Sequence, residues 1–346
     1  METAPLYLAL AAVAAIVALF GTIVVRHVAL ALNLADAPNE RRINTTPMPR
    51  AGGFAVALSF TIVGSAVAIL ASPLGLAGGT PIQTPGIAAL LFGVVLAGVI
   101  GLADDRFDLR ARWQLAGQLV IAAVPILFGV RIAILSNPFG AGDLLIPDAL
   151  GLALTLVWAL GMQNAMNFID GLDGLSGGIA LIAATTLGLI ALPATPLLAA
   201  LCFVLAGALA GFLRHNFYPA SIYMGTSGIL AVAYALAVLS LLGTAKVVAA
   251  LLILGVPIID AFFVIVGRLL AGRSPYSADK THIHQRLIDA GLSHRGAVLV
   301  LYGITLLLSV GAVVLTASAA LYAFAGLLVL LGGAIVWLSR RAERRT

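Results

Sequence analysis

Long apolar stretches, uninterrupted by charge, recur along this 346-residue chain. A helix needs about 20 such residues to cross the ~30 Å hydrocarbon layer of a membrane. Because hydrocarbon offers no water, backbone groups inside it must pair within a helix or a closed barrel. The stretches are continuous rather than alternating, which fits helices and does not fit the strands of a barrel. We therefore predict an all-α integral membrane protein.

Composition supports this class and gives no sign of a second domain. Hydrophobic residues make up 62% of the chain, charged residues only 10%, and the mean hydropathy is +1.12. A soluble domain carries about 25% charged residues. No long linker divides the chain, so residues 1–346 are predicted to form a single transmembrane domain. We expect about eleven spans (10–11), at 6–26, 52–72, 85–103, 113–130, 149–166, 176–192, 196–213, 226–243, 246–270, 296–316 and 319–338.

The cations lie almost entirely in alternate segments between the expected spans. Of the 19 Lys and Arg residues, 17 fall in one set of segments, and only Arg131 and Lys246 fall in the other. Loops rich in Lys and Arg stay on the cytoplasmic side. We therefore expect a multi-pass protein of the plasma (inner) membrane, with its N-terminus outside and its C-terminus in the cytoplasm. Residues 1–8 carry no cation, so the first span is expected to remain as an anchor.

Acidic and histidine side chains gather on the same expected side. Ten of the 14 acids and all five histidines fall there, whereas Asp260 lies within the ninth span beside Pro257 and is expected to anchor a helix bend. A transporter would more often place such groups near the bilayer midplane, so an enzyme acting on cytosolic substrates is favoured. Nucleic acid is not an expected partner, because the cations are divided among short loops. The single Cys202 permits no disulfide within the chain.

The first of four polar clusters is an aspartate pair at the end of the third span. Asp104 and Asp105 are adjacent, and Asp108 follows three residues later. Neighbouring carboxylates repel each other unless a positive group lies between them. A divalent cation with oxygen ligands meets that need, and a solvated helix end balanced by nearby arginines is the alternative.

The second cluster combines amides, carboxylates and glycines at the end of the fifth span. Asn164 and Asn167 are three residues apart and share a helix face. Asp170 and Asp173 follow, among glycines that allow tight turns and close backbone approach. Such oxygens suit a metal–phosphate or nucleotide site, and a glycine-rich loop with Asx turns is the alternative.

The third cluster, His215–Gly228, ends in small residues at the expected start of the eighth span. Free N–H groups at a helix start can hold an anion. A simple N-cap by Thr226 or Ser227 is the alternative.

The fourth cluster is a basic loop that contains a His-x-His pair. His282 and His284 lie between Arg268 and Arg286 along the chain, with Arg273 and Lys280 nearby. Guanidinium and imidazole groups of this kind suit phosphate oxygens. A purely topological, positive-inside loop is the alternative.

In this order, the clusters resemble the polyprenyl-phosphate N-acetylhexosamine-1-phosphate transferase superfamily, glycosyltransferase family 4. Asp104 and Asp105 resemble its aspartate pair, and residues 164–175 match its Asn-x-x-Asn-x-x-Asp-Gly-x-x-Gly-Leu motif. Residues 49–53 resemble its Pro-Arg-x-Gly-Gly motif. Residues 274–287 are similar to the His-Ile-His-His-Arg-Leu loop of its bacterial undecaprenyl-phosphate GlcNAc-1-phosphate transferase branch.

The resemblance, which covers about residues 41–295, implies a cytoplasmic active-site cleft. It implies Mg2+ (with Mn2+ as a substitute), a UDP-N-acetylhexosamine donor and a polyprenyl (undecaprenyl) phosphate acceptor, and it allows a homodimer. By this likeness the catalytic residues would be Asp104, Asp105, His282 and His284. The nucleotide and its phosphates would be bound by Asn164, Asp170, Asp173, Arg112, Arg268 and Arg286. The metal would be held by Asn167, Asp105 and Thr226.

Three positions depart from the family pattern. Thr226 stands where the family has an aspartate that is a principal metal ligand, and Gln285 replaces the last histidine of His-Ile-His-His. Gln114 lies where many relatives have a lysine, and Arg112 nearby could serve instead. Either the metal is held differently here or activity has been lost.

The expected reaction is transfer of a HexNAc-1-phosphate, with GlcNAc as the default, to the lipid phosphate. The products would be a polyprenyl-diphosphate-sugar and UMP, and the reaction would initiate cell-envelope glycan synthesis such as that of lipopolysaccharide or teichoic acid. Two alternatives stay open. One is a weakened relative that binds UDP-sugar or lipid phosphate without turnover, and the other is a transporter.

Overall fold

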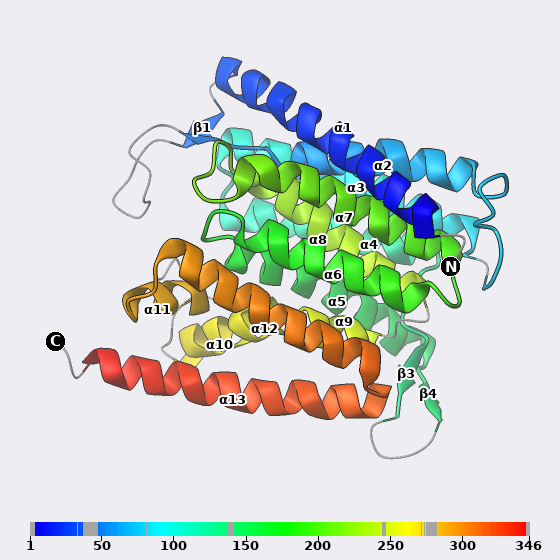
Figure 1. Ribbon diagram of the computed structural model, residues 1–346. Coiled ribbons are helices and arrows are strands. Elements are labelled where there is room, and N and C mark those ends of the chain that lie inside the picture. The colour runs from blue at the N-terminus through cyan, green and yellow to red at the C-terminus, as the bar shows by residue number, and fades with distance from the viewer. Residues whose placement is uncertain are drawn as a thin grey trace.

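Helices lying side by side form the body of the molecule in a computed structural model of the chain (Figure 1). The structure describes residues 4–32, 34–36, 48–80, 82–137, 142–243, 247–270, 272, 274 and 282–343. Several charged residues used in the sequence analysis lie outside these ranges: Glu2, Glu40, Arg41, Arg42, Lys246, Arg273, Asp279, Lys280, Arg344 and Arg345.

Thirteen helices follow one another within the described residues. They are α1 (Ala4–Ala31), α2 (Phe54–Ile69), α3 (Thr84–Phe107), α4 (Ala111–Leu127), α5 (Asp148–Ile169), α6 (Leu175–Ala191), α7 (Pro196–Asn216), α8 (Gly225–Leu242), α9 (Val247–Ile253), α10 (Gly255–Leu270), α11 (Ile283–Asp289), α12 (His294–Val314) and α13 (Ala317–Glu343). Every expected span coincides with a helix, and the ninth coincides with two.

The helix lengths support the membrane class but do not establish the number of spans. Among the described residues, α1, α3, α5, α7, α8 and α12 are long and apolar enough to cross a membrane, and the bent pair α9–α10 would make a seventh span. The other apolar helices, α2, α4, α6 and the part of α13 up to Gly333, have 10–17 residues. The structure therefore confirms a helical integral membrane protein, whereas the count of eleven spans stays a prediction.

The expected span at 246–270, in which the sequence predicts a helix bend beside Pro257, is divided into two helices. Helices α9 and α10 meet at an angle of 80°. Proline has no N–H, and its ring crowds the carbonyl four residues earlier. For Pro257 that residue is Ile253, where α9 ends. An apolar run conceals such a break, because hydropathy does not report backbone geometry.

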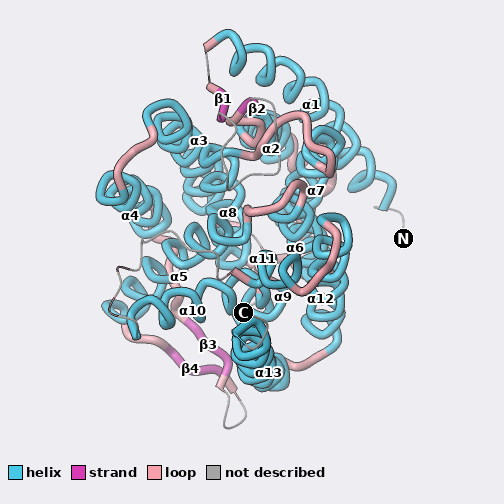
Figure 2. Tube along the Cα trace, turned by 90° about the vertical axis from the view of Figure 1, so that its left-hand side faces the viewer, coloured by secondary structure: helices cyan, strands magenta, loops and turns pink. Residues whose placement is uncertain are grey.

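Helix α8 lies in the middle of the bundle, with α3, α5, α6 and α7 around it (Figure 2). Every residue from Ser227 to Ser240 is buried, as expected of a helix that is apolar on all sides. The Tyr234 hydroxyl donates to the carbonyl of Ala89 on α3 at 2.8 Å. The indole N–H of Trp158 on α5 donates to the carbonyl of Ala237 at 3.2 Å. These contacts hold α8 so that its N-terminal end is fixed relative to its neighbours.

Small residues allow α1 and α7 to pack closely. A Cβ added at Gly207 would lie 2.0 Å from the carbonyl oxygen of Ala11, and one at Gly211 would lie 2.1 Å from that of Ala15. Glycines four residues apart are a usual means of bringing two membrane helices together. This contact secures α1 against the bundle.

Two short antiparallel ribbons, which the sequence analysis does not predict, occupy loops. Strand β1 (Ala35–Asp36) pairs with β2 (Met48–Pro49), and β3 (Ile134–Ser136) pairs with β4 (Asp143–Leu145). Strand β2 leads directly into the segment that carries Arg50, next to the start of α8.

Candidate active site

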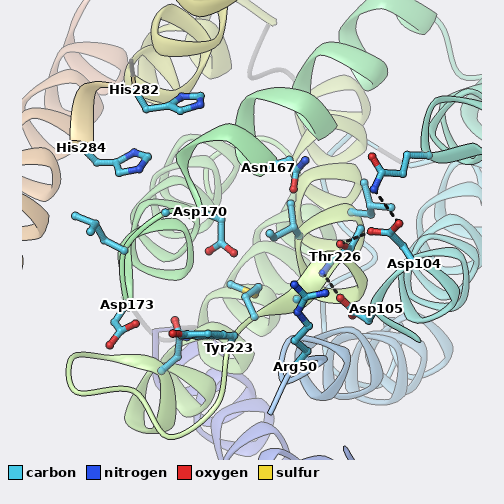
Figure 3. A pocket seen from close by; sticks show the side chains of 18 of the residues that line it. Arg50, Asp104, Asp105, Asn167, Asp170, Asp173, Tyr223, Thr226, His282 and His284 are labelled. Carbon is cyan, nitrogen blue, oxygen red and sulfur yellow. Dashed lines mark hydrogen bonds between the residues drawn. The ribbon is translucent and has the colours of Figure 1, made fainter. Parts of the chain in front are cut away.

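A cavity of about 680 Å³ lies where ends of α3, α5, α7, α8, α11 and α12 come together (Figure 3). Eight of the twelve predicted site residues line it: Asp104, Asp105, Asn167, Asp170, Asp173, Thr226, His282 and His284. Loops that the cation count assigned to one face of the membrane thus meet around one cavity. The contribution of four separate sequence clusters to one cavity is what makes it the candidate site.

The carboxylate of Asp104 accepts three hydrogen bonds from this chain. Its Oδ1 accepts from the side-chain amide of Gln114 at 2.9 Å and from the backbone N–H of Leu109 at 3.2 Å. Its Oδ2 accepts from the hydroxyl of Thr226 at 2.7 Å. The two residues that depart from the family pattern beside this carboxylate therefore both contact it as neutral donors.

The neighbouring carboxylate, Asp105, anchors the start of α8. It accepts from the backbone N–H of Thr226 at 2.8 Å and from that of Ser227 at 3.1 Å. A carboxylate at a helix N-terminus pairs with N–H groups that have no partner within the helix. Only glycine fits before Thr226, because Gly225 has φ of 72° and an added Cβ would lie 2.7 Å from Asp105 Oδ2. Asp105 thus fastens α3 to α8.

The segment after β2 supplies a cation that the sequence analysis left outside the site. Arg50 lines the cavity near Asp105 (Figure 3). Backbone bonds hold its segment: Tyr223 N–H donates to the Pro49 carbonyl, and Gly52 N–H donates to the Tyr223 carbonyl, both at 2.9 Å. The Pro-Arg-x-Gly-Gly match was the available signal, because it marks Arg50 as part of a family motif.

The end of α5 and the turn after it form the opposite wall. Figure 3 shows Asp170 and Asp173 on one side of the cavity, Asp104 on the other, and Asn167 and Thr226 between them. The Ser176 hydroxyl donates to Asp170 Oδ1, and the Ala220 N–H donates to Asp173 Oδ2 at 3.0 Å. The bonds to Ser176 and Ala220 orient both carboxylates of this turn.

Four polar residues that were not predicted as site residues contribute to this wall. Gly174, at φ of 80°, donates its N–H to the side-chain oxygen of Asn216 at 3.2 Å. Tyr302 donates to the Gly174 carbonyl at 2.5 Å. The ring of Tyr218 stacks on that of His294, with centroids 4.5 Å apart, and both line the cavity.

Four predicted site residues do not line the cavity. Asn164 donates to the side-chain oxygen of Gln118 at 3.1 Å and to the Leu160 carbonyl at 2.8 Å, so it supports Gln118, which does line the cavity. The other three are arginines: Arg112 is exposed beside the ring of Trp113, Arg268 is buried over the ring of Phe168 at 5.2 Å, and Arg286 is half-buried on α11.

The two histidines of the basic loop lie together at the cavity. Their rings are nearly parallel, with centroids 5.5 Å apart and 10° between planes. The ring of His284 packs against the backbone of Gly171, where an added Cβ would lie 2.0 Å from Nε2. Burial lowers the pKa of His284 to about 4, so this imidazole is neutral at neutral pH. Residues 275–281, in the loop between α10 and α11, lie outside the described residues.

The cavity offers oxygen donors suited to a hard cation. Among the described residues, no group of three His, Cys, Asp or Glu side chains is arranged to hold a metal. Mg2+ is commonly held by one or two carboxylates together with substrate phosphates, and it prefers oxygen ligands. Asp104, Asp170, Asn167 and Thr226 provide such oxygens around one space (Figure 3). The donor chemistry therefore fits Mg2+ with a phosphorylated substrate as co-ligand.

These features define a class: a helical membrane protein whose cavity brings together carboxylates, an arginine and imidazoles from loops between apolar helices. Comparison with known proteins identifies the family within that class. Residues 87–244 match the family model described as "Glycosyl transferase family 4". The chain belongs to this family, that of the polyprenyl-phosphate HexNAc-1-phosphate transferases.

Three relatives show how far the likeness extends. The chain is 36% identical over 305 residues to a probable undecaprenyl-phosphate N-acetylglucosaminyl 1-phosphate transferase of Bacillus subtilis, covering 86% of this chain and 81% of the relative. It is 40% identical over 317 residues to a decaprenyl-phosphate N-acetylglucosaminephosphotransferase of Mycobacterium tuberculosis, covering 84% and 77%. It is 30% identical over 305 residues to an undecaprenyl-phosphate alpha-N-acetylglucosaminyl 1-phosphate transferase of Escherichia coli, covering 83% and 78%.

Proposed function

We propose that this protein transfers a HexNAc-1-phosphate, with GlcNAc-1-phosphate as the default, from a UDP-sugar to a polyprenyl phosphate. The products are a polyprenyl-diphosphate-sugar and UMP. The observation that carries the proposal is the meeting of Asp104, Asn167, Asp170 and His282 around one cavity, in a chain whose relatives bear polyprenyl-phosphate N-acetylglucosamine-phosphate transferase names.

The reaction joins two anions, so charge is its main difficulty. A phosphate oxygen of the lipid attacks the β-phosphorus of the donor, the new P–O bond forms, and the bond to UMP breaks with its electron pair leaving on UMP. Positioning and charge stabilisation carry most of the catalysis in phosphoryl transfer. We assign Arg50 and His284 to the phosphate oxygens as hydrogen-bond donors, and His282 to a hydroxyl group of the donor.

We assign the metal ligands to Asn167, Asp104 and Asp170, with Thr226 contributing through its bond to Asp104. When bound, Mg2+ would neutralise the charge of the phosphate oxygens. Asp105 holds the start of α8 in place for this arrangement. A phosphate monoester has its second pKa near ~6 and is mostly ionised at neutral pH. No general base is therefore required, and Asp104 serves as an oxygen donor rather than as a proton acceptor.

The test is UMP release by the detergent-purified protein supplied with undecaprenyl phosphate and UDP-GlcNAc, with and without Mg2+. The proposal requires release that depends on both the lipid and Mg2+ and that is lost in Asp170→Asn. The exposed Asp148, which pairs with Arg131 on the surface, offers a matched Asp→Asn control. Full release without lipid phosphate would contradict the proposal.

One observation favours a second candidate, a binder without turnover. Thr226 is neutral, and its hydroxyl is engaged with Asp104, so the site has one carboxylate fewer than the family pattern. This candidate predicts that UDP-GlcNAc or lipid phosphate binds with micromolar affinity while no UMP appears with UDP-GlcNAc, UDP-GalNAc or a UDP-MurNAc-peptide. Measuring binding and release on one preparation separates the two candidates.

A further inference from the structure

A buried carboxylate lies behind the wall of the cavity and holds one of its histidines. Asp260 is 2% exposed in α10. Its Oδ2 lies 2.8 Å from Nδ1 of His282, and its Oδ1 accepts from the backbone N–H of Ile283 at 2.7 Å. The two residues bonded to Asp260 are 22 and 23 positions later in the chain. The carboxylate therefore links the helix after the break to the start of α11.

This bond decides which nitrogen of His282 is presented to the cavity. An ionised carboxylate only accepts hydrogen bonds, so Nδ1 of His282 must carry a proton. The other ring nitrogen, Nε2, is then left for the cavity, which His282 lines with a side chain 14% exposed. A carboxylate that orients a histidine in this way sets both its tautomer and its direction.

Neighbouring rings fix the plane of the imidazole. The Phe168 ring lies at 65° to it with centroids 5.4 Å apart, and the ring of His284 lies nearly parallel to it. The position of Ile283 is fixed by the second oxygen of Asp260. Asp260 thus sets the start of α11. Together with the rings of Phe168 and His284, it also sets the orientation of His282.

We propose that Asp260 is a positioning residue: it keeps His282 in the Nδ1–H form so that the lone pair of Nε2 accepts a hydrogen bond from a hydroxyl group of the bound substrate. The part concerning the substrate rests on the proposed function. Asp260→Asn separates the bond to Ile283 from the control of the His282 tautomer. Its side-chain oxygen can still accept from Ile283, but its amide group donates to Nδ1 and forces the proton onto Nε2. A similar Asp→Asn change in a Ser-His-Asp triad keeps the geometry and lowers turnover through the wrong tautomer.

The first arm of the test needs no activity. Protein labelled with 15N-histidine contains five histidines, and the signal lost in His282→Gln identifies His282. The nitrogen chemical shifts at pH 8 should report Nδ1–H for His282 in the wild type and Nε2–H in Asp260→Asn. A wild-type His282 in the Nε2–H form would overturn the proposal, and this result does not depend on whether Asp260→Asn folds.

The second arm measures UMP release. Asp260→Asn and His282→Gln should each lower the turnover number by at least about 10-fold, and the double variant should be no worse than His282→Gln alone. Asp148→Asn should match the wild type. Full turnover in Asp260→Asn, or losses that multiply in the double variant, would overturn the proposal. An inactive wild type would contradict the proposed function, whereas the tautomer arm would still decide the role of Asp260.

Discussion

Adjacent residues in the acidic pair have different partners and therefore different expected roles. Asp104 faces side-chain donors, Gln114 and Thr226, whereas Asp105 accepts from two backbone N–H groups at the start of α8. Asp104 therefore remains close to the chemistry of the cavity. Asp105 determines where the first turn of α8, including Thr226, is placed.

Asp105→Asn tests this division. An amide in place of the carboxylate directs an N–H₂ group at one of two backbone N–H groups and leaves a buried donor without a partner. We expect stability to fall by about 1–3 kcal/mol, seen as a lower thermal midpoint in detergent, together with a large loss of turnover. Asp148→Asn is the matched control, because exposed ion pairs contribute little. Turnover lost with an unchanged midpoint would instead assign Asp105 to the ligands of the metal.

Gly171→Ala tests the contact between the α5–α6 turn and the basic loop. The added Cβ would lie 2.0 Å from Nε2 of His284 and 2.5 Å from its Cε1, so the ring or the turn must move. We expect at least about a 10-fold loss of turnover, because small displacements of positioned groups are costly in catalysis. Gly161→Ala on α5 is the control, since nothing lies within 4 Å of the added Cβ. Equal activity of the two variants would remove His284 from the site.

The lowered pKa of His284 predicts how the free energy of unfolding depends on pH. Its folded pKa is lowered to about 4 by burial, below its ordinary value of 6.5. The unfolded chain therefore takes up the proton first as pH falls, and stability contributed by neutral His284 is lost progressively between pH 6.5 and about 4. The thermal midpoint should fall across this window in the wild type and fall less in His284→Gln. An identical slope in the two proteins would contradict the burial of this ring.

At the scale of elements, the contact between α1 and α7 depends on glycines, at which no side chain fits between the two helices. Gly207→Ala places a methyl group 2.0 Å from the Ala11 carbonyl oxygen, so the two helices must separate. Overpacking of this kind costs about 1–3 kcal/mol. We expect a lower thermal midpoint than in Gly303→Ala on α12, where nothing lies within 4 Å of the added Cβ. Equal midpoints would mean that α1 is not held by this contact.

Hydropathy predicted the places of the helices well, because an apolar run in a membrane has few alternatives to a helix. Hydropathy alone does not locate the break between α9 and α10, because Pro257 leaves the run apolar; the bend expected there rests on the backbone donor that proline lacks. The ribbons β1–β2 and β3–β4 were also missed. They are two to three residues long and carry no alternating pattern.

The site was predicted in its residue types more than in its contacts. Asn167, Asp170 and Thr226, which come from two separate motifs, line the same cavity. Asn164 shares the helix face of Asn167 but lies almost one turn deeper, where Gln118 meets it. The partner of His282 could not be found from spacing, because Asp260 reaches it through the fold.

At the scale of the whole molecule, the cation count and the cavity agree. Segments assigned to one side by their Lys and Arg residues supply Arg50, Asp104, Asp173, Thr226 and His282 to the same space. Alternate segments of a chain that crosses a membrane repeatedly lie on the same side of it, which allows them to meet around one cavity. The cytoplasmic placement of that side, and of the C-terminus, stays a prediction from the positive-inside rule.

The central claim is that a sugar and its attached phosphate move together onto a lipid. Its most direct measurement uses UDP-GlcNAc labelled with 32P at the β-phosphorus, mixed with undecaprenyl phosphate, Mg2+ and the purified protein, followed by extraction into organic solvent. Label should enter the lipid fraction in step with UMP release, and neither should occur in Asp170→Asn. Label that stays in the aqueous phase while sugar reaches the lipid, or a lipid fraction without label under every condition, would contradict this claim.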